Sequence, residues 1–303
     1  MYKLISFFLI TVSVYAEITP IPLTVEYNKV KAELGKKLFF DPILSKDKTI
    51  SCASCHTLPG SGANSTQFSF GINASEGNLN TPTVLNSVFN FTQFWDGRVK
   101  TLHQQALFPL TNPIEMADSV ENILNKLSNS PYKKEFKKIY KDGVTQNNLI
   151  ESIVEFEKAL ITPNSKFDKY LRGDSTAITA QEKRGYEIFK EAGCISCHNG
   201  VNVGGNMFQK VGLMVPYKSG SKGRYNLTLR ERDKFVYKVP SLRNIELTAP
   251  YLHDGTVQTL RDAIIFMREY QLDIIETDSE VDDIEAFLKT LTGEMPEILK
   301  DIK

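Results

Sequence analysis

Apolar side chains recur at helical spacing in three stretches of the chain. In residues 28–40, Val30, Leu34 and Leu38 stand four residues apart, which predicts one apolar helical face. Residues 149–160 and 281–291 show the same spacing, with apolar side chains at Leu149, Ile153, Phe156, Leu160, Ile284, Phe287, Leu288 and Leu291. The alternating pattern of half-buried strands is weak throughout. We therefore expect a mainly helical protein with long loops.

These stretches divide the chain into two halves with a similar plan. The helix over residues 28–40 is broken at Asp41-Pro42, and the helix over 149–160 closes the first half. In the second half, Thr179 and Glu182 have the spacing of a capping box, which predicts the start of a helix. The two halves therefore resemble a degenerate repeat, and the helix over residues 281–291 closes the second.

A polar stretch, residues 163–178, separates the halves and is typical of an inter-domain connection. We therefore expect two domains, residues 17–165 and residues 166–303. The first sixteen residues belong to neither, because Lys3 precedes a short apolar run that ends in small residues before Glu17. This pattern predicts a signal peptide over residues 1–16 and a periplasmic protein, since the run is shorter than the roughly 20 residues that span a bilayer.

Composition is that of an ordinary soluble protein, with 41% hydrophobic and 24% charged residues in 303. The formal net charge is zero, which gives no reason to expect a nucleic acid or an anionic membrane as partner.

All four cysteines lie in two copies of a Cys-x-x-Cys-His motif, SCASCH and GCISCH. In an exported protein a disulfide is the first alternative, and a redox dithiol or half of a zinc site would also use the cysteine pair. The adjacent histidine favours haem, because two thiols then form thioethers while the imidazole binds the iron. A zinc ribbon would place its cysteine pairs about 15–20 residues apart, far closer than here. We therefore predict two covalently bound haem c groups, held by Cys52, Cys55, His56, Cys194, Cys197 and His198.

The sixth ligand of each iron decides between electron transfer and chemistry, because an open position admits substrate. Spacing alone leaves the choice open among His103, His253, Met116, Met207, Met214, Met267 and Met295. A methionine at helical spacing is usually core filler, and Met267 follows Leu260 and Ile264 at that spacing.

Several long strings resemble, in order along the chain, those of the bacterial di-haem cytochrome c peroxidases. They are LGKKLFFDPILS, NTPTVLNSVFNFTQFWDGR, GCISCHNGVNVGG and VPSLRNIELTAPYLHDG. The resemblance implies two cytochrome c-like helical domains, each enclosing one haem. It also implies reduction of hydrogen peroxide to water, with electrons from a small cytochrome c or a blue-copper protein (a cupredoxin), and a homodimer of the kind that relatives commonly form.

The same resemblance assigns roles to single residues. The C-terminal haem, with His198 and Met267 as its axial ligands, would pass electrons, since a methionine ligand raises the reduction potential. The N-terminal haem would be the peroxidatic centre, with Glu115 as its distal acid–base residue, Gln105 as the partner of Glu115, and Trp95 as the bridge between the haems. Without the resemblance, Glu115 would be interpreted as a solvated acid, Gln105 as a surface amide and Trp95 as a core aromatic residue.

Asn80, Thr248 and Pro250 match the positions that hold a calcium ion between the domains of family members, the last two through backbone carbonyls. His253 matches a position near the electron-receiving haem and has no ligand role. His103 has no counterpart with a role, and we expect it on a helix surface.

One departure from the family concerns the loop after the first motif. Many members carry a histidine there that binds the peroxidatic iron in the resting enzyme, whereas the aligned loop FSFGINASEGN holds Ile72. Residues 57–94 contain neither histidine nor methionine. We hypothesise that the first haem is five-coordinate or water-bound when oxidised, so the enzyme needs no reductive activation.

Two alternatives to a peroxidase remain. A related di-haem enzyme that oxidises side chains of a partner protein would carry a tyrosine as the second haem's axial ligand, and Met267 counts against it. A non-catalytic di-haem electron carrier would have both irons six-coordinate, and Glu115 and Gln105 would then be incidental.

Overall fold

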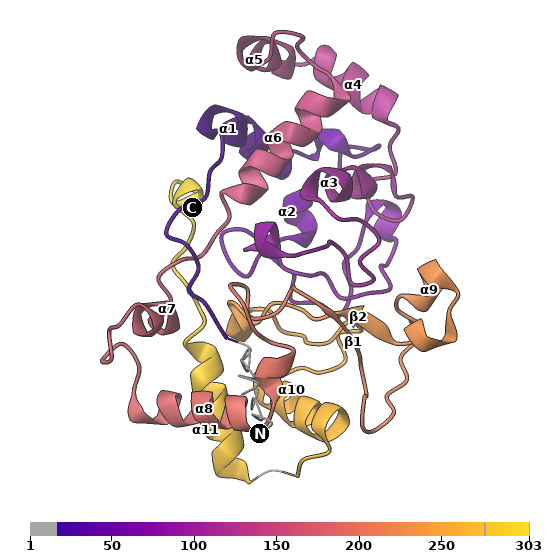
Figure 1. Ribbon diagram of the computed structural model, residues 1–303. Helices are drawn as coiled ribbons and strands as arrows, with labels where there is room; N and C mark the ends of the chain where they lie inside the picture. The colour runs from indigo at the N-terminus through magenta and orange to yellow at the C-terminus, as the bar shows by residue number, and fades with distance from the viewer. Residues whose placement is uncertain (1–16, 276, 303) are drawn as a thin grey trace, which may run out of the picture.

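The computed structural model describes residues 17–275 and 277–302, and the predicted signal peptide lies outside them. Most regular structure is helical, as the hydrophobic pattern predicts (Figure 1). The α-helices are α1 (Lys29–Phe40), α2 (Cys52–Cys55), α3 (Leu102–Thr111), α4 (Val120–Ser128), α5 (Tyr132–Ile139), α6 (Gln146–Lys158), α7 (Lys166–Leu171), α8 (Ala180–Glu191), α9 (Tyr225–Thr228), α10 (Leu260–Phe266) and α11 (Asp278–Lys289). In the described residues one antiparallel sheet occurs, β1 (Phe208–Lys210) paired with β2 (Val236–Lys238).

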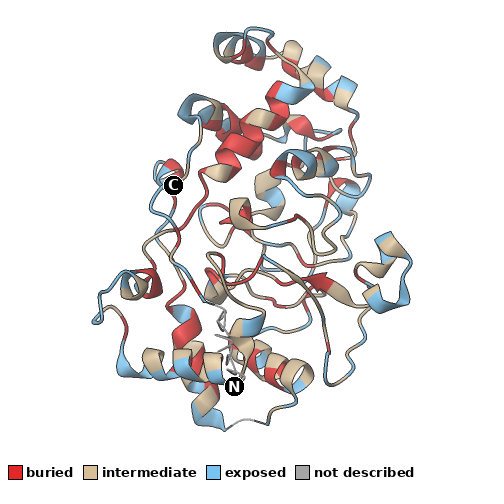
Figure 2. Ribbon diagram, in the orientation of Figure 1, coloured by how far each residue is buried: buried red, intermediate tan, exposed pale blue. Residues whose placement is uncertain are grey.

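The first half is built on the packing of α1 against α6 (Figure 2). Leu34 and Leu38 are buried between these helices, as their spacing predicts, but Val30 is 61% exposed, so its assignment to the buried face was wrong. Val30 lies in the first turn of α1. The crossing is very close at Gly35, where a Cβ atom would lie 1.9 Å from the carbonyl oxygen of Ser152.

The second half repeats this arrangement with α8 and α11. The predicted capping box is confirmed, with Thr179 as N-cap and Glu182 bonding back to it. A glycine again sits at the crossing, because a Cβ atom on Gly185 would lie 1.8 Å from the carbonyl oxygen of Asp283. In both halves, the helix that precedes the Cys-x-x-Cys-His motif thus crosses the closing helix at a glycine, where the two backbones approach closely.

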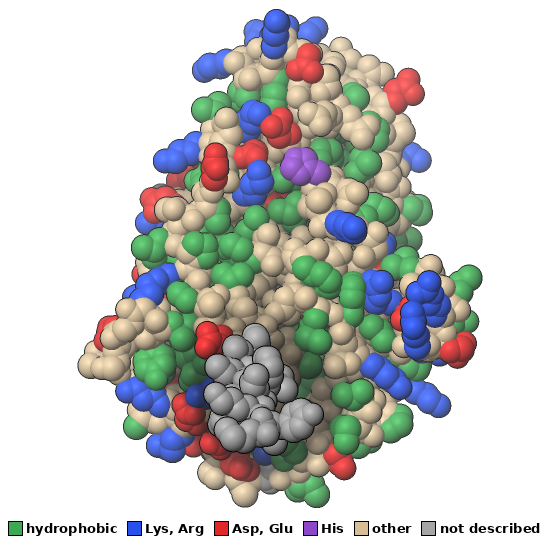
Figure 3. All heavy atoms as spheres, in the orientation of Figure 1, with side chains coloured by type: hydrophobic (Ala, Val, Ile, Leu, Met, Phe, Trp, Pro, Cys, Tyr) green, Lys and Arg blue, Asp and Glu red, His purple; other side chains and the backbone are tan. Residues whose placement is uncertain are grey.

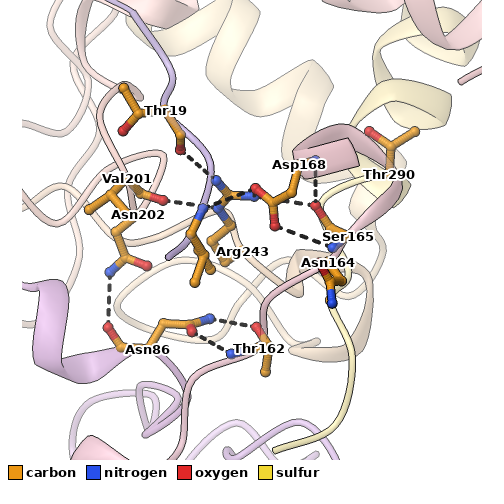
Figure 4. A network of polar contacts seen from close by, with 12 residues as sticks. Thr19, Asn86, Thr162, Asn164, Ser165, Asp168, Val201, Asn202, Arg243 and Thr290 are labelled. Carbon is orange, nitrogen blue, oxygen red and sulfur yellow. Dashed lines mark hydrogen bonds and ion pairs between the residues drawn. The ribbon is translucent and has the colours of Figure 1, made fainter. Parts of the chain in front are cut away.

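The segment expected to be a polar connection contains helix α7 and is partly core. Phe167 is fully buried in the C-terminal hydrophobic cluster, and Asp168 forms a buried ion pair with Arg243 at 2.8 Å. Arg243 also donates to the carbonyl oxygens of Thr19 and Val201, which fixes three separate segments around α7 (Figure 4). The expectation missed this helix because its few apolar residues lie among polar ones, and their burial depends on distant partners.

The two described ends of the chain each pack against the opposite half. Ile18 belongs to the C-terminal hydrophobic cluster, whereas Ile298 and Leu299 pack with Phe39 in the N-terminal half. Lys36 donates to the carbonyl oxygen of Ile298 at 2.6 Å, and Figure 1 shows the C-terminus beside α1. These crossings join the two halves, because the C-terminal cluster includes Ile18 and a smaller cluster of the N-terminal half includes Ile298 and Leu299.

Long loops follow both motifs, as expected: residues 56–101 contain only short 3₁₀ turns, and residues 198–259 add only α9 and the small sheet. Residues of both loops line a small cavity between the halves. In the described residues, no helix has the length and apolar character needed to cross a bilayer.

Candidate functional site

The first Cys-x-x-Cys-His motif forms a single helical turn on the wall of a large cavity. Ser51 and Ser54 form the capping box of α2, and His56 follows its last residue. Cys52, Cys55 and His56 line a cavity with about 1510 Å³ of empty space, together with residues of α3 and of the loop after the motif. Both thiols are free, which argues against the disulfide alternative.

The second motif lines a separate cavity in the C-terminal half. Residues Cys194–Ser196 form a 3₁₀ turn after α8, and Cys194, Cys197 and His198 line about 1200 Å³ of empty space. These two thiols are also free. Each half thus has one cavity with two thiols and one imidazole on its wall.

Both imidazoles are prepared to act as metal ligands. Nδ1 of His56 lies 3.0 Å from the carbonyl oxygen of Gly62, and Nδ1 of His198 lies 3.4 Å from that of Val203. A ring that donates from Nδ1 to a carbonyl presents an unprotonated Nε2 to a metal. Burial lowers the pKa of His56 and lowers that of His198 to about 4, which keeps both rings neutral. The residues present therefore fit two covalently attached haems.

Glu115 and Gln105 lie on the wall of the N-terminal cavity, where the resemblance predicts them. Gln105 comes from α3 and Glu115 from the turn after it, and both are half-buried rather than fully solvated. Asn112 donates to Oε1 of Glu115 at 2.6 Å. Burial raises the pKa of Glu115 above its ordinary value, against the opposing effects of Asn112 and Arg98. The carboxyl group is therefore protonated more readily than that of a solvated glutamate.

Ile72 is buried and does not line the N-terminal cavity. Its backbone N–H donates to the carbonyl oxygen of Glu115 at 2.9 Å, and a bridge between Phe70 and Glu76 closes the loop around it. The loop that carries a ligand in many family members is here attached to the backbone of Glu115. Among the described residues on the cavity wall, His56 is the only histidine.

Met267 lies at the C-terminal end of α10 and lines the same cavity as His198. A π-helical turn, Met267–Gln271, begins there. Of the methionines in the described residues, none but Met267 lines this cavity, whereas Met214 and Met295 are exposed. Met116 lines the other cavity and packs in the hydrophobic core.

Trp95 lies between the two cavities and lines both. Its indole Nε1 donates to the carbonyl oxygen of Asn80 at 2.8 Å, and its own carbonyl accepts from the backbone N–H of Lys238 at 2.7 Å. His253 lines the C-terminal cavity, lies 3.9 Å from the Tyr237 ring in a stacked arrangement, and its Nε2 lies 2.6 Å from Ser219 Oγ. His103 is exposed on α3, as expected.

The three predicted calcium ligands line one small cavity between the halves. Asn80, Thr248 and Pro250 meet there with Trp95 and Lys238. No acidic side chain occurs among the described residues on its wall, and no cluster of three or more acidic, histidine or cysteine side chains suited to a metal occurs in the described residues. A calcium ion here would depend on neutral protein oxygens.

Sequence reasoning missed two buried charged residues on the cavity walls. Glu157, on α6, is 5% exposed and lines the N-terminal cavity, where Oε2 has no hydrogen-bond partner among the described residues. Burial raises its pKa to about 8. Lys238, on β2, lines the C-terminal cavity and the small cavity between the halves, and burial lowers its pKa to about 8. Glu157 stands seven residues after Ile150, so an acid at the edge of the apolar stripe of α6 was the available signal.

Known proteins resemble this chain over most of its length. A family described as di-haem cytochrome c peroxidase matches residues 29–176. Cytochrome c551 peroxidase of Nitrosomonas europaea is 48% identical over 284 residues, which cover 92% of this chain and 85% of that protein. Cytochrome c peroxidase Ccp of Escherichia coli is 46% identical over 94% of this chain, although the chain spans only 63% of that protein's length. The crystal structure of a MauG-like protein associated with microbial copper homeostasis has a TM-score of 0.82, 26% identity and 98% coverage of both chains.

Proposed function

This chain belongs to the di-haem cytochrome c peroxidase family, and from that premise we propose that it reduces hydrogen peroxide to water at its N-terminal cavity. It is an oxidoreductase of the peroxidase class, as its relatives' names indicate. The observation that carries the choice of cavity is Glu115, which lies on the same wall as Cys52, Cys55 and His56 and has a raised pKa.

When bound, the two haems supply the redox chemistry, the C-terminal one passing electrons and the N-terminal one reducing the peroxide. The overall reaction consumes two electrons and two protons, breaks the O–O bond of one peroxide and releases two waters. A carboxyl group that takes a proton from bound peroxide and returns it to the departing oxygen serves both proton transfers, and Glu115 is the acid we assign to this task.

Gln105 would orient the peroxide, and Asn112 would orient the carboxyl group of Glu115. Asn112 holds Oε1 of Glu115 through its amide, which leaves Oε2 to exchange the proton. Gln105 lines the same cavity from α3 and offers one donor and one acceptor to the substrate. The cavity is partly screened from water, which strengthens these hydrogen bonds.

Electrons would enter through the C-terminal cavity, from a small cytochrome c or a cupredoxin, and reach the N-terminal cavity by way of Trp95. Support comes from Met267, which lines the C-terminal cavity, and from Trp95, which lines both. On the face drawn in Figure 3 basic and acidic side chains both occur, so charge does not single out one kind of donor there. We further propose a periplasmic location, a homodimer, and a calcium ion at Asn80, Thr248 and Pro250.

We also propose that the enzyme is active without prior reduction. The loop carrying Ile72 is hydrogen-bonded to Glu115 and offers neither histidine nor methionine to the cavity, so no such ligand has to leave before peroxide binds. The test is steady-state peroxide turnover with and without prereduction, together with visible spectra of the oxidised holoprotein. We expect equal turnover and a five-coordinate or water-bound N-terminal haem. A purely six-coordinate, low-spin N-terminal haem, with turnover only after prereduction, would contradict the proposal.

The same preparation separates the peroxidase from the electron carrier. Peroxide added to the fully reduced holoprotein should rapidly reoxidise both haems, whereas an electron carrier in which both irons are six-coordinate would react slowly. The partner-oxidising alternative is not favoured, because Met267 occupies the position where that enzyme would carry a tyrosine.

A further inference from the structure

Lys238 is a buried lysine for which the described residues supply no partner. Its backbone is fixed, because the N–H donates to Trp95 and β2 pairs with β1 at Phe208. Lys238 is only 7% exposed, yet its Nζ forms no hydrogen bond or ion pair with any described residue. An unpaired ammonium group in such a position is costly, and proteins usually neutralise it with an anion.

Among the described residues, no acidic side chain that could serve lines either of the two cavities that Lys238 lines. The described residues on the wall of the C-terminal cavity include Lys210, Lys238 and Arg268 but neither aspartate nor glutamate, and the small cavity between the halves also has none. Arg268 itself contacts Glu280, 3.5 Å away. The anion that balances Lys238 must therefore come from whatever occupies the cavity.

The occupant that fits the C-terminal cavity is a haem, which carries two propionate carboxylates besides the groups that bond Cys194 and Cys197. We propose that Lys238 is the counter-ion of a propionate of the C-terminal haem, held next to Trp95. An ammonium–carboxylate pair satisfies both buried charges at once, whereas either group alone would be desolvated without compensation. The proposal rests on the cofactor assignment and does not depend on the reaction with peroxide.

Replacing Lys238 would leave a negative charge uncompensated close to the iron. Negative charge disfavours adding an electron, so the reduction potential of the C-terminal haem should fall. Lys210 supplies a matched control, because it lines the same cavity from β1 but is exposed, and water screens the loss of its charge.

The experiment is a redox titration of the holoprotein, following the absorbance of the C-terminal haem in K238M, K238R and K210M. For K238M we expect the reduced-to-oxidised ratio at a fixed potential to drop about tenfold, which is a shift of about 59 mV for one electron. K238R should restore most of the wild-type potential, and K210M should move it by less than a third of the K238M shift. Redox-difference infrared spectra should show a propionate carboxylate band that moves in K238M and stays in K210M.

A potential in K238M equal to that of the wild type, or a K210M shift as large as that of K238M, would overturn the proposal. Where K238M does not accumulate as holoprotein, K238Q replaces it in the same titration, and a wild-type potential in K238Q also overturns it. If the potential shifts as expected while the wild-type holoprotein shows no peroxide turnover, the proposed function fails and the ion pair stands.

Discussion

The two haem cavities begin with the same motif but differ in the charges on their walls. Cys-x-x-Cys-His supplies two thiols and one imidazole to each, and both imidazoles have Nδ1 near a backbone carbonyl. The N-terminal wall adds two acids, the half-buried Glu115 and the buried Glu157, whereas the C-terminal wall adds Lys238 and other basic residues and no described acid. Acids with raised pKa values can move protons, and a basic wall favours holding an electron. Identical motifs thus lie in different surroundings, from which we infer different chemistry.

Removing the acid from the N-terminal cavity should have the largest effect. In E115Q the amide cannot carry a proton, so we expect peroxide turnover to fall about 100- to 10,000-fold with the visible spectra nearly unchanged. The measurement is steady-state turnover of the holoprotein with a reduced donor. E121Q, on the exposed first turn of α4, is the matched control and should turn over like the wild type. Turnover in E115Q above half the wild-type rate would contradict the proposal that Glu115 makes the N-terminal cavity the site of proton transfer.

Changing the ligand of the C-terminal cavity should have the next largest effect. M267A removes the side chain that we propose as the second axial ligand, and a methionine ligand raises the reduction potential. At a fixed potential we therefore expect the reduced-to-oxidised ratio of that haem to fall at least about tenfold. The spectral features of the N-terminal haem should not change. M214A alters an exposed methionine outside the cavity and is the control. An unaltered spectrum of the C-terminal haem in M267A would show that another residue is its ligand.

The smallest expected effect concerns stability and compares two acids on α6. Burial raises the folded-state pKa of Glu157 to about 8, against about 4.3 in an unfolded chain. Between these values the folded state binds one more proton than the unfolded state, so stability falls as pH rises from about 4.3 to 8, by about 1.4 kcal/mol per pH unit. E157Q should therefore lose less stability than the wild type across this range, measured by denaturant unfolding of the holoprotein.

Glu155 should show the opposite sign. Although burial raises its pKa, hydrogen bonds from Lys158 and from the backbone of Asn28 lower it below the ordinary value. Its stabilising contribution is complete above the unfolded-state pKa and is lost as pH falls through the folded-state value. E155Q should therefore be less stable than the wild type at pH 7, with the difference shrinking in acid. Parallel pH profiles for E157Q and E155Q would contradict both assignments.

Much of the fold followed from short-range patterns. The helices α1, α6 and α11, the capping box of α8 and the long loops were all predicted, because periodic burial and capping are local properties. Val30 and α7 were not, because the exposure of one depends on the segments packed around α1 and the burial of the other depends on Arg243 and the C-terminal core. A sequence window contains neither partner.

The sequence by itself determined the cofactors, because Cys-x-x-Cys-His holds thiols and imidazole within one turn of backbone. The resemblance added Glu115, Gln105 and Met267, which the structure places on the walls of the expected cavities, while their roles stay predictions. Only the tertiary structure decided that Trp95 touches both cavities and that Glu157 and Lys238 are buried ionisable residues without a partner among the described residues. Burial and charge compensation depend on segments far apart in the chain, and these meet only when the two halves are folded together.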